Sequence, residues 1–342
     1  MDVRKLLVAL TEAVGVSGAE DGAAQVALAE LRRFSPDAAM DAFGNVSARF
    51  GAWRDDRPIL LLDAHIDEIG LIVTHITEDG FLKVGNCGGV DRRLLLAQQV
   101  IIHGRERLAG VICSKPPHLE KGDESKKTPE VDAIAIDTGF SREQLIKRVS
   151  PGDRVTLHTS TRTLLGDRIT GKSMDDRAGV AVILRALELL DATETTFNIA
   201  VQFSTQEEVG ERGAKIAAYS VSPDYAIAVD VSFAHTPDAP EHKCGKLGEG
   251  VMIGVSPTLS REMSDTLHTL AAGQGIPHQT EVMAGETSTN ADVIGVTRSG
   301  AKTSTLSIPL RYMHTPVEVV SLADLEATAR LIAAYAKEGF HA

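Results

Sequence analysis

The pattern of apolar and polar positions predicts alternating helices and strands at the start of the chain. A second helix is expected at about residues 20–33, and a short strand near 44–50 precedes an apolar strand at 58–64. The first predicted helix carries its apolar residues on one face, at Leu6, Leu7, Leu10 and Val14. Repeated alternation of helix and strand is typical of an α/β layer architecture.

The pattern changes after Gly70. Residues 69–165 contain several short β-branched runs separated by Gly, Pro and Asp turns, with few helical patterns between them. This texture is typical of a small antiparallel β-domain or barrel. Helical periodicity returns at 176–190, and the α/β alternation then continues to the end. We therefore predict a catalytic α/β domain formed by residues 1–68 and 166–342, with residues 69–165 as an inserted β-domain.

Length and composition favour a two-domain globular protein. The chain has 342 residues, which exceeds what one core usually accommodates. A net charge of −12 and an aromatic content of 4% argue against a nucleic acid or an anionic membrane as partner. The polar, proline-rich stretch Lys115–Lys127 is predicted to be an exposed loop.

Three widely spaced cysteines, Cys87, Cys113 and Cys244, form no metal-binding or disulfide pattern and suit a reducing compartment. The N-terminal residues lack the order of a signal peptide, and we find no apolar run long enough to span a membrane. We expect a cytoplasmic protein.

The first candidate functional residues are two adjacent glutamates, Glu207 and Glu208, which follow an apolar strand. Within a regular strand neighbouring side chains point to opposite faces. At the strand end, where Val209-Gly210 breaks the pattern, both can turn toward the same crevice, which is where α/β sheets bind ligands. A hydrolytic metal site needs such carboxylates, one to hold metal and one to take a proton from the attacking water.

In four other segments, a histidine or an aspartate that could bind metal lies at the end of a predicted strand or at the start of a predicted helix. Imidazole and carboxylate groups are the ligands expected for zinc, cobalt or manganese. A local zinc motif such as HExxH is absent, so the site must be assembled from several strand ends. Asp67, two residues beyond His65, is expected to fix the imidazole tautomer. The predicted ligands are His65, Asp175, Glu208, Asp230 and His314, with Asp175 as the bridge between two metals.

The segments DAHIDEIG, GKSMDDRAG, QEEVGERGA, AIAVDVS and RYMHTPVE, in this order and spacing, resemble the TET-type dinuclear metalloaminopeptidases. This family includes glutamyl and leucyl aminopeptidases, and some members were once misnamed cellulases. The resemblance covers nearly the whole chain. It implies a zinc-peptidase-like mixed sheet flanked by helices, with an inserted small β-barrel-like domain used in oligomerisation. It also implies that dimers assemble into a hollow homododecamer.

The resemblance also implies roles for individual residues. His65, Asp175 and Asp230 would hold one metal, Glu208 and His314 would complete the other, and Glu207 would be the general base. The peptide bond after Asp175 is expected to be cis. One stretch, GETSTNADVIG, departs from the family pattern, because Asn290 or Asp292 stands where an aspartate is expected. This departure concerns contacts with the substrate and leaves the ligand set intact.

The leading functional hypothesis is a metalloaminopeptidase that removes N-terminal residues from short peptides with two divalent ions per subunit. A deacylase or carboxypeptidase of the same dinuclear clan is an alternative. A glycoside hydrolase would need two carboxyl groups and no metal, and it would leave His65 and His314 without a role. A non-catalytic peptide-binding protein would not need Glu207 beside a complete ligand set. The sequence leaves open the preferred N-terminal residue, the native metal and the role of His118.

Overall fold

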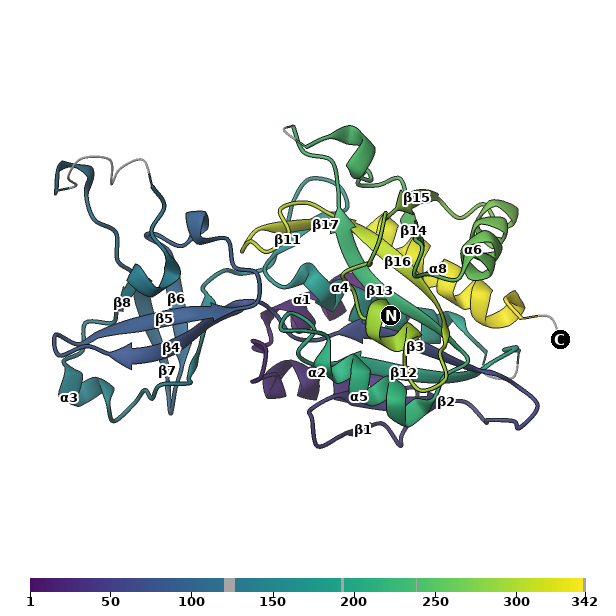
Figure 1. Cartoon of the computed structure of the whole chain (residues 1–342), viewed down its shortest axis with the longest axis horizontal. Coiled ribbons are helices and arrows are strands. Elements are labelled where there is room, and N and C mark those ends of the chain that lie inside the picture. The colour runs from purple at the N-terminus through teal and green to yellow at the C-terminus, as the bar shows by residue number, and fades with distance from the viewer. Residues whose placement is uncertain (120–126, 192–193, 238, 341–342) are drawn as a thin grey trace.

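An eight-stranded mixed sheet forms the centre of the larger part of the molecule in the computed structural model (Figure 1). The structure describes residues 1–342 except 120–126, 192–193, 238 and 341–342. The strand order is β1 (Ala39–Met40), β2 (Val46–Phe50), β12 (Asn198–Ser204), β3 (Ile59–His65), β13 (Tyr225–Phe233), β16 (Lys302–Leu310), β14 (Val251–Val255) and β15 (His278–Val282). The central strands β12, β3, β13 and β16 run parallel, so their carboxyl ends meet at one edge.

Helices cover both faces of this sheet. One face carries α1 (Val3–Glu12), α2 (Asp21–Leu31), α4 (Met174–Leu189), α6 (Arg261–Gly273) and α8 (Leu322–Glu338). The other carries α5 (Arg212–Val221) and α7 (Ala291–Gly295). Strand β3 serves both cores, because Leu60 and Leu62 pack into the larger one while Leu61 packs under α5 and α7. Burial on both faces explains why the central strands are continuous apolar runs.

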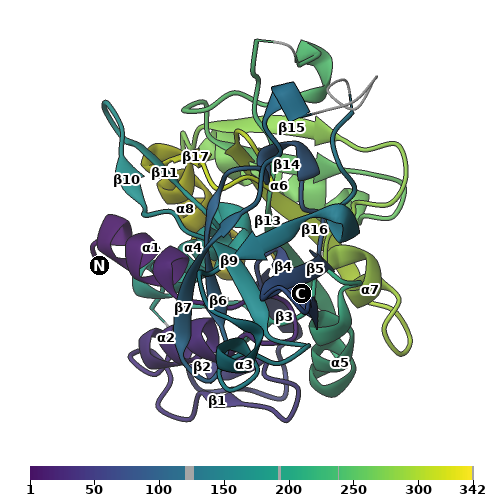
Figure 2. The same cartoon turned by 90° about the vertical axis from the view of Figure 1, so that its left-hand side faces the viewer.

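The second part of the molecule is a closed barrel that stands beside the sheet (Figures 1 and 2). Its strands alternate between the barrel interior and the outside, as β7 does with one exposed residue before each buried one. The strands, in order around the barrel, are β4 (Gly70–Ile76), β5 (Phe81–Cys87), β8 (Ala135–Asp137), β7 (Arg107–Ile112), β6 (Gln99–His103) and β9 (Arg154–Leu157).

Short elements complete the described chain. A three-stranded sheet joins β10 (Arg162–Thr163), β11 (Arg168–Gly171) and β17 (Glu318–Ser321). Short helical turns are α3 (Arg142–Leu145), η1 (Arg92–Leu94), η2 (Pro117–Leu119), η4 (Val131–Ala133) and η5 (Glu241–Lys243). Within the described residues, no helix has both the length and the apolar character needed to cross a lipid bilayer.

The predicted fold class, a mixed sheet flanked by helices with a small β-barrel-like insert, is confirmed. Barrel strands lie between Gly70 and Leu157, whereas β10 pairs with β11 outside the barrel. The limits of the two predicted domains, and a role of the insert in oligomerisation, stay predictions. Of the predicted loop Lys115–Lys127, residues 120–126 lie outside the described residues, and His118 is exposed.

Candidate metal centre

The predicted site residues converge at the carboxyl edge of the parallel strands. His65 ends β3 and lies opposite Ser204, the last residue of β12, which continues into Glu207 and Glu208. Asp230 lies in β13, His314 follows β16, and Asp175 lies in the first turn of α4. The structure brings all of the predicted ligands together, and we call His65, Asp175, Glu207, Glu208, Asp230 and His314 the candidate metal centre.

Asp175 lies between the two imidazoles. Its Oδ1 is 2.9 Å from Nε2 of His65, and its Oδ2 is 3.3 Å from Nε2 of His314. Ligand atoms of His65, Asp175 and Asp230 lie within 4.8 Å of one another, and so do those of Asp175, Glu208 and His314. Asp175 is the residue shared by these two groups, which is the geometry a bridging carboxylate requires. The peptide bond after Asp175 is cis, as the family resemblance predicts.

Both histidines are oriented through their other ring nitrogen. Nδ1 of His65 lies 3.1 Å from the backbone carbonyl oxygen of Asp67, and Nδ1 of His314 lies 3.0 Å from that of Gly89. A carbonyl oxygen can only accept, so each Nδ1 carries a proton. Each Nε2 faces Asp175, to which it donates when protonated and beside which it could bind a cation when deprotonated. This is how metal-binding histidines are usually held.

Asp67 holds the turn that carries the two glutamates. Its Oδ1 accepts a hydrogen bond from the backbone N–H of Glu207 at 3.0 Å, and its Oδ2 accepts from that of Glu208 at 3.2 Å. The hydroxyl of Ser17 donates to the same carboxylate at 2.7 Å. Because the turn begins at Gln206 with a φ of 57°, the chain leaves the strand conformation there and both side chains reach the same side. The Asp67 carboxylate therefore acts on this turn as well as lying 3.4 Å from His65 Nδ1.

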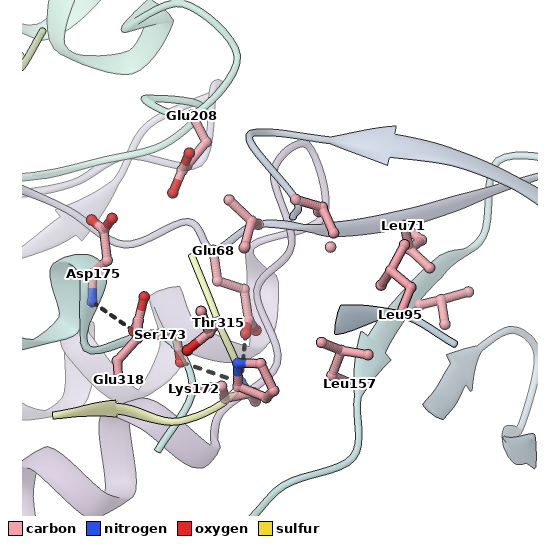
Figure 3. Close-up of a pocket in the computed structure, with 15 residues that line it drawn as sticks. Glu68, Leu71, Leu95, Leu157, Lys172, Ser173, Asp175, Glu208, Thr315 and Glu318 are labelled. Carbon is pink, nitrogen blue, oxygen red and sulfur yellow. Dashed lines mark hydrogen bonds and ion pairs between the residues drawn. The ribbon is translucent and has the colours of Figure 1, made fainter. Parts of the chain in front are cut away.

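Glu318 is a buried residue that sequence reasoning missed. Its Oε2 accepts hydrogen bonds from the backbone N–H groups of Met174 at 2.7 Å and Asp175 at 3.3 Å, and its Oε1 accepts from that of His314 at 2.9 Å (Figure 3). Of these three bonds, Figure 3 draws the one to Asp175. One carboxylate thus fixes the backbone at two predicted ligands. Its position four residues after His314 in RYMHTPVE was the available signal, but one glutamate at the start of a strand predicts no particular contact.

The electrostatics of the centre fit a bound cation. Burial, reinforced by neighbouring carboxylates and opposed by His65, raises the pKa of Glu207 to about 9 and that of Asp230 to about 8. Burial would also raise the pKa of Asp175, but hydrogen bonds from His314 and His65 lower it. The residues around these carboxylates therefore do not supply enough positive charge for all of them. Divalent cations would supply it, and the imidazole and carboxylate donors suit such ions.

Asn290 lies beneath the site and is not among the described residues that line the cleft beside it. Asn290 is buried, and its amide donates to Oδ2 of Asp63 at 2.6 Å and to Oγ of Ser204 at 2.8 Å. Asp63 and Ser204 lie on the two strands that lead to the metal centre. Asp292, in contrast, lines the cleft and accepts hydrogen bonds from the backbone N–H groups of the preceding loop.

The cleft beside the candidate metal centre has a volume of about 620 Å³. Asp175, Glu207, Glu208, Asp230 and His314 line one part of it, so a molecule bound there would contact the centre directly. This volume lies within the range of small-molecule sites in enzymes. A separate, much smaller cavity of about 30 Å³ lies between the sheet and the barrel, where Lys172 pairs with Glu68 at 2.6 Å (Figure 3).

A mixed sheet that gathers imidazoles and carboxylates at one strand edge, next to a cleft, is typical of metal-dependent hydrolases. Residues 44–331 match the protein family described as M42 glutamyl aminopeptidase. The chain is 32% identical to the lysyl aminopeptidase of Pyrococcus furiosus, with 98% of this chain and 96% of that protein covered.

Solved structures of aminopeptidases are also similar to this chain. An aminopeptidase from the archaeon Desulfurococcus kamchatkensis superposes with a TM-score of 0.91 at 35% identity, covering 98% of this chain and 94% of that one. The TET1 peptidase of Pyrococcus horikoshii superposes with a TM-score of 0.86 at 32% identity, covering 98% and 100%. The chain therefore belongs to the M42 family of glutamyl aminopeptidases, and it is a metal-dependent aminopeptidase. The resemblance predicted from the five motifs is confirmed.

Proposed function

We propose that the chain hydrolyses the first peptide bond of short peptides with two divalent cations held by the candidate metal centre. His65, Asp175 and Asp230 would hold one cation, and Asp175, Glu208 and His314 the other. The observation that carries this assignment is the position of Asp175, whose two oxygens face the two imidazoles separately at 2.9 and 3.3 Å. When bound, such cations polarise the scissile carbonyl and make the attacking water more acidic.

Glu207 is the proposed general base. Among the described residues its carboxylate accepts no hydrogen bond, and its nearest cationic neighbour is His65 Nε2 at 4.0 Å. The side chain is nearly buried and lines the cleft, so it can reach the substrate side of the centre. Glu207 would take a proton from water as the water oxygen bonds to the carbonyl carbon. It would then deliver that proton to the leaving nitrogen as the C–N bond breaks.

The native metal is proposed to be zinc, cobalt or manganese, because the donor set accepts all three. The test starts from protein stripped of metal, which is titrated with each ion while bound metal is counted. Turnover of aminoacyl anilides with free and with blocked N-termini is measured in parallel. We expect two ions per chain and turnover of the free N-termini alone. Preference for blocked substrates would favour the deacylase alternative, and cleavage from the other end would favour a carboxypeptidase.

The glycoside hydrolase alternative loses its basis in this structure. It gives no role to His65 and His314, yet both lie in the same cluster as the carboxylates. The family match to aminopeptidases also argues against a glycoside hydrolase.

We further propose that the chain forms a homo-oligomer, a dodecamer built from dimers, through the insert at residues 69–165. The TET1 peptidase of Pyrococcus horikoshii can assemble into a tetrahedron or a large octahedral shell, which supports an assembly of this kind. In this chain the barrel stands beside the sheet (Figure 1), and it exposes apolar residues such as Val111 and Ile146. A stable monomer in light scattering, fully active on peptides, would contradict this assembly.

A cytoplasmic location completes the proposal. The structure contains Cys87, Cys113 and Cys244 as free thiols, which supports a reducing compartment. Fractionation of cells that produce the protein at native levels tests this location.

A further inference from the structure

We propose that the cleft beside the candidate metal centre selects peptides whose N-terminal residue is lysine or arginine, and that Glu211 determines this preference. The inference rests on the proposed function, because it assumes that the first side chain of the peptide occupies this cleft. The names of relatives leave the question open, since the family is described as glutamyl and one relative as lysyl aminopeptidase.

The cleft remains negatively charged after the metal centre has been neutralised. Its lining includes four carboxylates of the centre, at Asp175, Glu207, Glu208 and Asp230. Two divalent cations would carry four positive charges and offset these four. Three further carboxylates line the cleft at Glu211, Glu286 and Asp292, and no lysine or arginine is among the described lining residues. A cationic side chain is therefore the natural complement, and an acidic side chain would meet repulsion without a cation to pair with.

Glu211 is the carboxylate best placed to act. It follows Glu208 by three residues and precedes α5, so the same turn that carries the predicted base and ligand also positions it. Its carboxylate is half-buried, and no described residue donates a hydrogen bond to it or pairs with it as an ion. Burial, and then the charges of Asp292 and Glu286, raise its pKa to about 7. A cationic ligand would stabilise the charged form of this half-buried, unpaired carboxylate.

The two other carboxylates are less available. Asp292 accepts hydrogen bonds from the backbone N–H groups of Thr287 and Ser288, each at 2.8 Å, so much of its acceptor capacity is used. Glu286 is exposed to solvent, where charge pairs are screened. We assign the main contribution to Glu211 and a smaller one to Glu286.

The rest of the cleft suits a long side chain with an apolar stem. Phe233, Val293 and Met313 line it, and Phe233 is 58% exposed although it is a large aromatic residue. Lysine and arginine combine a hydrocarbon stem, which packs on such side chains, with a cationic end that reaches carboxylates. An aromatic face also attracts a cation directly.

A further observation supports a cation at the wall of this cleft. Asp230 is only 7% exposed, yet the one hydrogen bond that its carboxylate accepts within the described chain is from the N–H of Val231, at Oδ1. Its Oδ2 is left without a donor at the wall of the same cleft. The cation proposed for His65, Asp175 and Asp230 would complete this carboxylate.

The test compares lysyl, norleucyl and glutamyl anilides on the full-length, metal-loaded protein. Norleucine keeps an unbranched hydrocarbon chain and lacks the ammonium group, so the ratio of the two values of kcat/KM isolates the charge. We expect a lysyl-to-norleucyl ratio of at least about tenfold, since one charge-assisted hydrogen bond is sufficient for that factor. The glutamyl substrate should be the slowest. In parallel, calorimetry should show that free L-lysine binds more tightly than free L-norleucine.

Glu211→Gln should lower the lysyl-to-norleucyl ratio about tenfold. Glu78→Gln is the matched control, because Glu78 is a well exposed carboxylate in the barrel turn between β4 and β5 and should leave the ratio unchanged. Circular dichroism and metal content report whether Glu211→Gln is folded and loaded. If it is not, Glu286→Gln provides the second variant, with a smaller expected loss of the ratio.

Equal lysyl and norleucyl rates, or a ratio that survives Glu211→Gln in a folded and metal-loaded protein, would overturn the inference. Failure of the inference and failure of the proposed function are separable. Turnover of norleucyl substrate without charge preference removes only the inference. Absence of turnover on every aminoacyl substrate in the presence of bound metal removes the proposed function itself.

Discussion

The sheet and the barrel of this molecule use β-strands in opposite ways. All seven residues of β12 are buried, because helices cover both faces of the sheet. Barrel strand β7 buries every second residue and exposes the others. A strand fixed from both faces holds the residues at its end in defined positions, which a catalytic centre requires. A strand with an open outer face leaves that face for contacts with other chains.

The division is not complete, because the loop after β5 touches the metal centre. The backbone carbonyl oxygen of Gly89, in the loop after β5, accepts the hydrogen bond from His314 Nδ1 at 3.0 Å. Arg154 of β9 also donates from Nε to the backbone carbonyl oxygen of Ser17 at 3.0 Å. The barrel thus contributes no proposed ligand but helps to orient one. For this reason we expect that deleting residues 69–165 would weaken the metal site as well as any assembly.

The largest effect is expected at the residue that joins the two predicted metal positions. Asp175→Asn should lose both ions and with them all turnover, because one carboxylate serves both positions. Metal content per chain after dialysis measures this. Loss of a single ion would make Asp175 a terminal ligand instead of a bridge. The barrel should be unaffected, so any change in particle size would show that the two parts are more strongly coupled than the comparison implies.

Glu207→Gln should reduce kcat by ~10²–10⁴-fold while bound metal and fold remain, because a general base contributes about that factor. Glu207 lies beside the proposed ligand Glu208 on the same turn, and we assign it no metal. The measurement is steady-state kinetics together with metal content. Near-normal turnover in the Gln variant would remove Glu207 from the mechanism and return the assignment to Glu208 or Asp230.

The sequence predicted the sheet and the proposed ligands for one reason. Strands buried on both faces are continuous apolar runs, and parallel strands place the residues that follow them at one edge. His65, Asp230 and His314 could therefore be predicted to lie together, although they are far apart in the chain. The closed barrel was predicted only as a class, since short alternating runs do not fix which strands pair.

The groups that orient these ligands could not be predicted in the same way. Gly89 acts through its backbone carbonyl oxygen, which carries no signal in the residue type. Glu318 accepts three backbone N–H groups, and Asn290 bonds Asp63 from a loop more than two hundred residues away. Such contacts depend on tertiary structure. Pattern reasoning did not decide between Asn290 and Asp292 as the departing residue, because it had no information on which side of the strand ends each side chain lies.

A third prediction tests the support that Glu318 of β17, in the three-stranded sheet, gives to the proposed ligands. Glu318→Gln should weaken metal binding by up to about 100-fold, which is the upper range for residues that orient ligands. Whichever way the new amide is turned, its NH₂ group faces a backbone N–H that previously met an acceptor. Metal affinity, measured by competition with a chelator, is the readout that a purely structural role would not change. Glu326→Gln on α8, where the carboxylate pairs with Arg185 at the surface, is the control. Equal metal affinity in Glu318→Gln and Glu326→Gln would show that Glu318 does not orient the proposed ligands.

The smallest effect tests the contact between Gly89 of the insert and His314 of the centre. A Cβ added at Gly89 would lie 2.6 Å from Nδ1 of His314, so Gly89→Ala must displace the imidazole or the loop. We expect a roughly tenfold loss of affinity for the cation held by His314, with the other cation retained. Gly85→Ala in β5 is the matched control, because its Cβ would meet nothing closer than 3.5 Å. Chelator competition that resolves the two sites decides the outcome. If Gly89→Ala binds both ions normally, the barrel does not orient His314 and the two parts of the molecule are functionally separate. If it loses one ion while particle size is unchanged, the barrel contributes to the metal site independently of assembly.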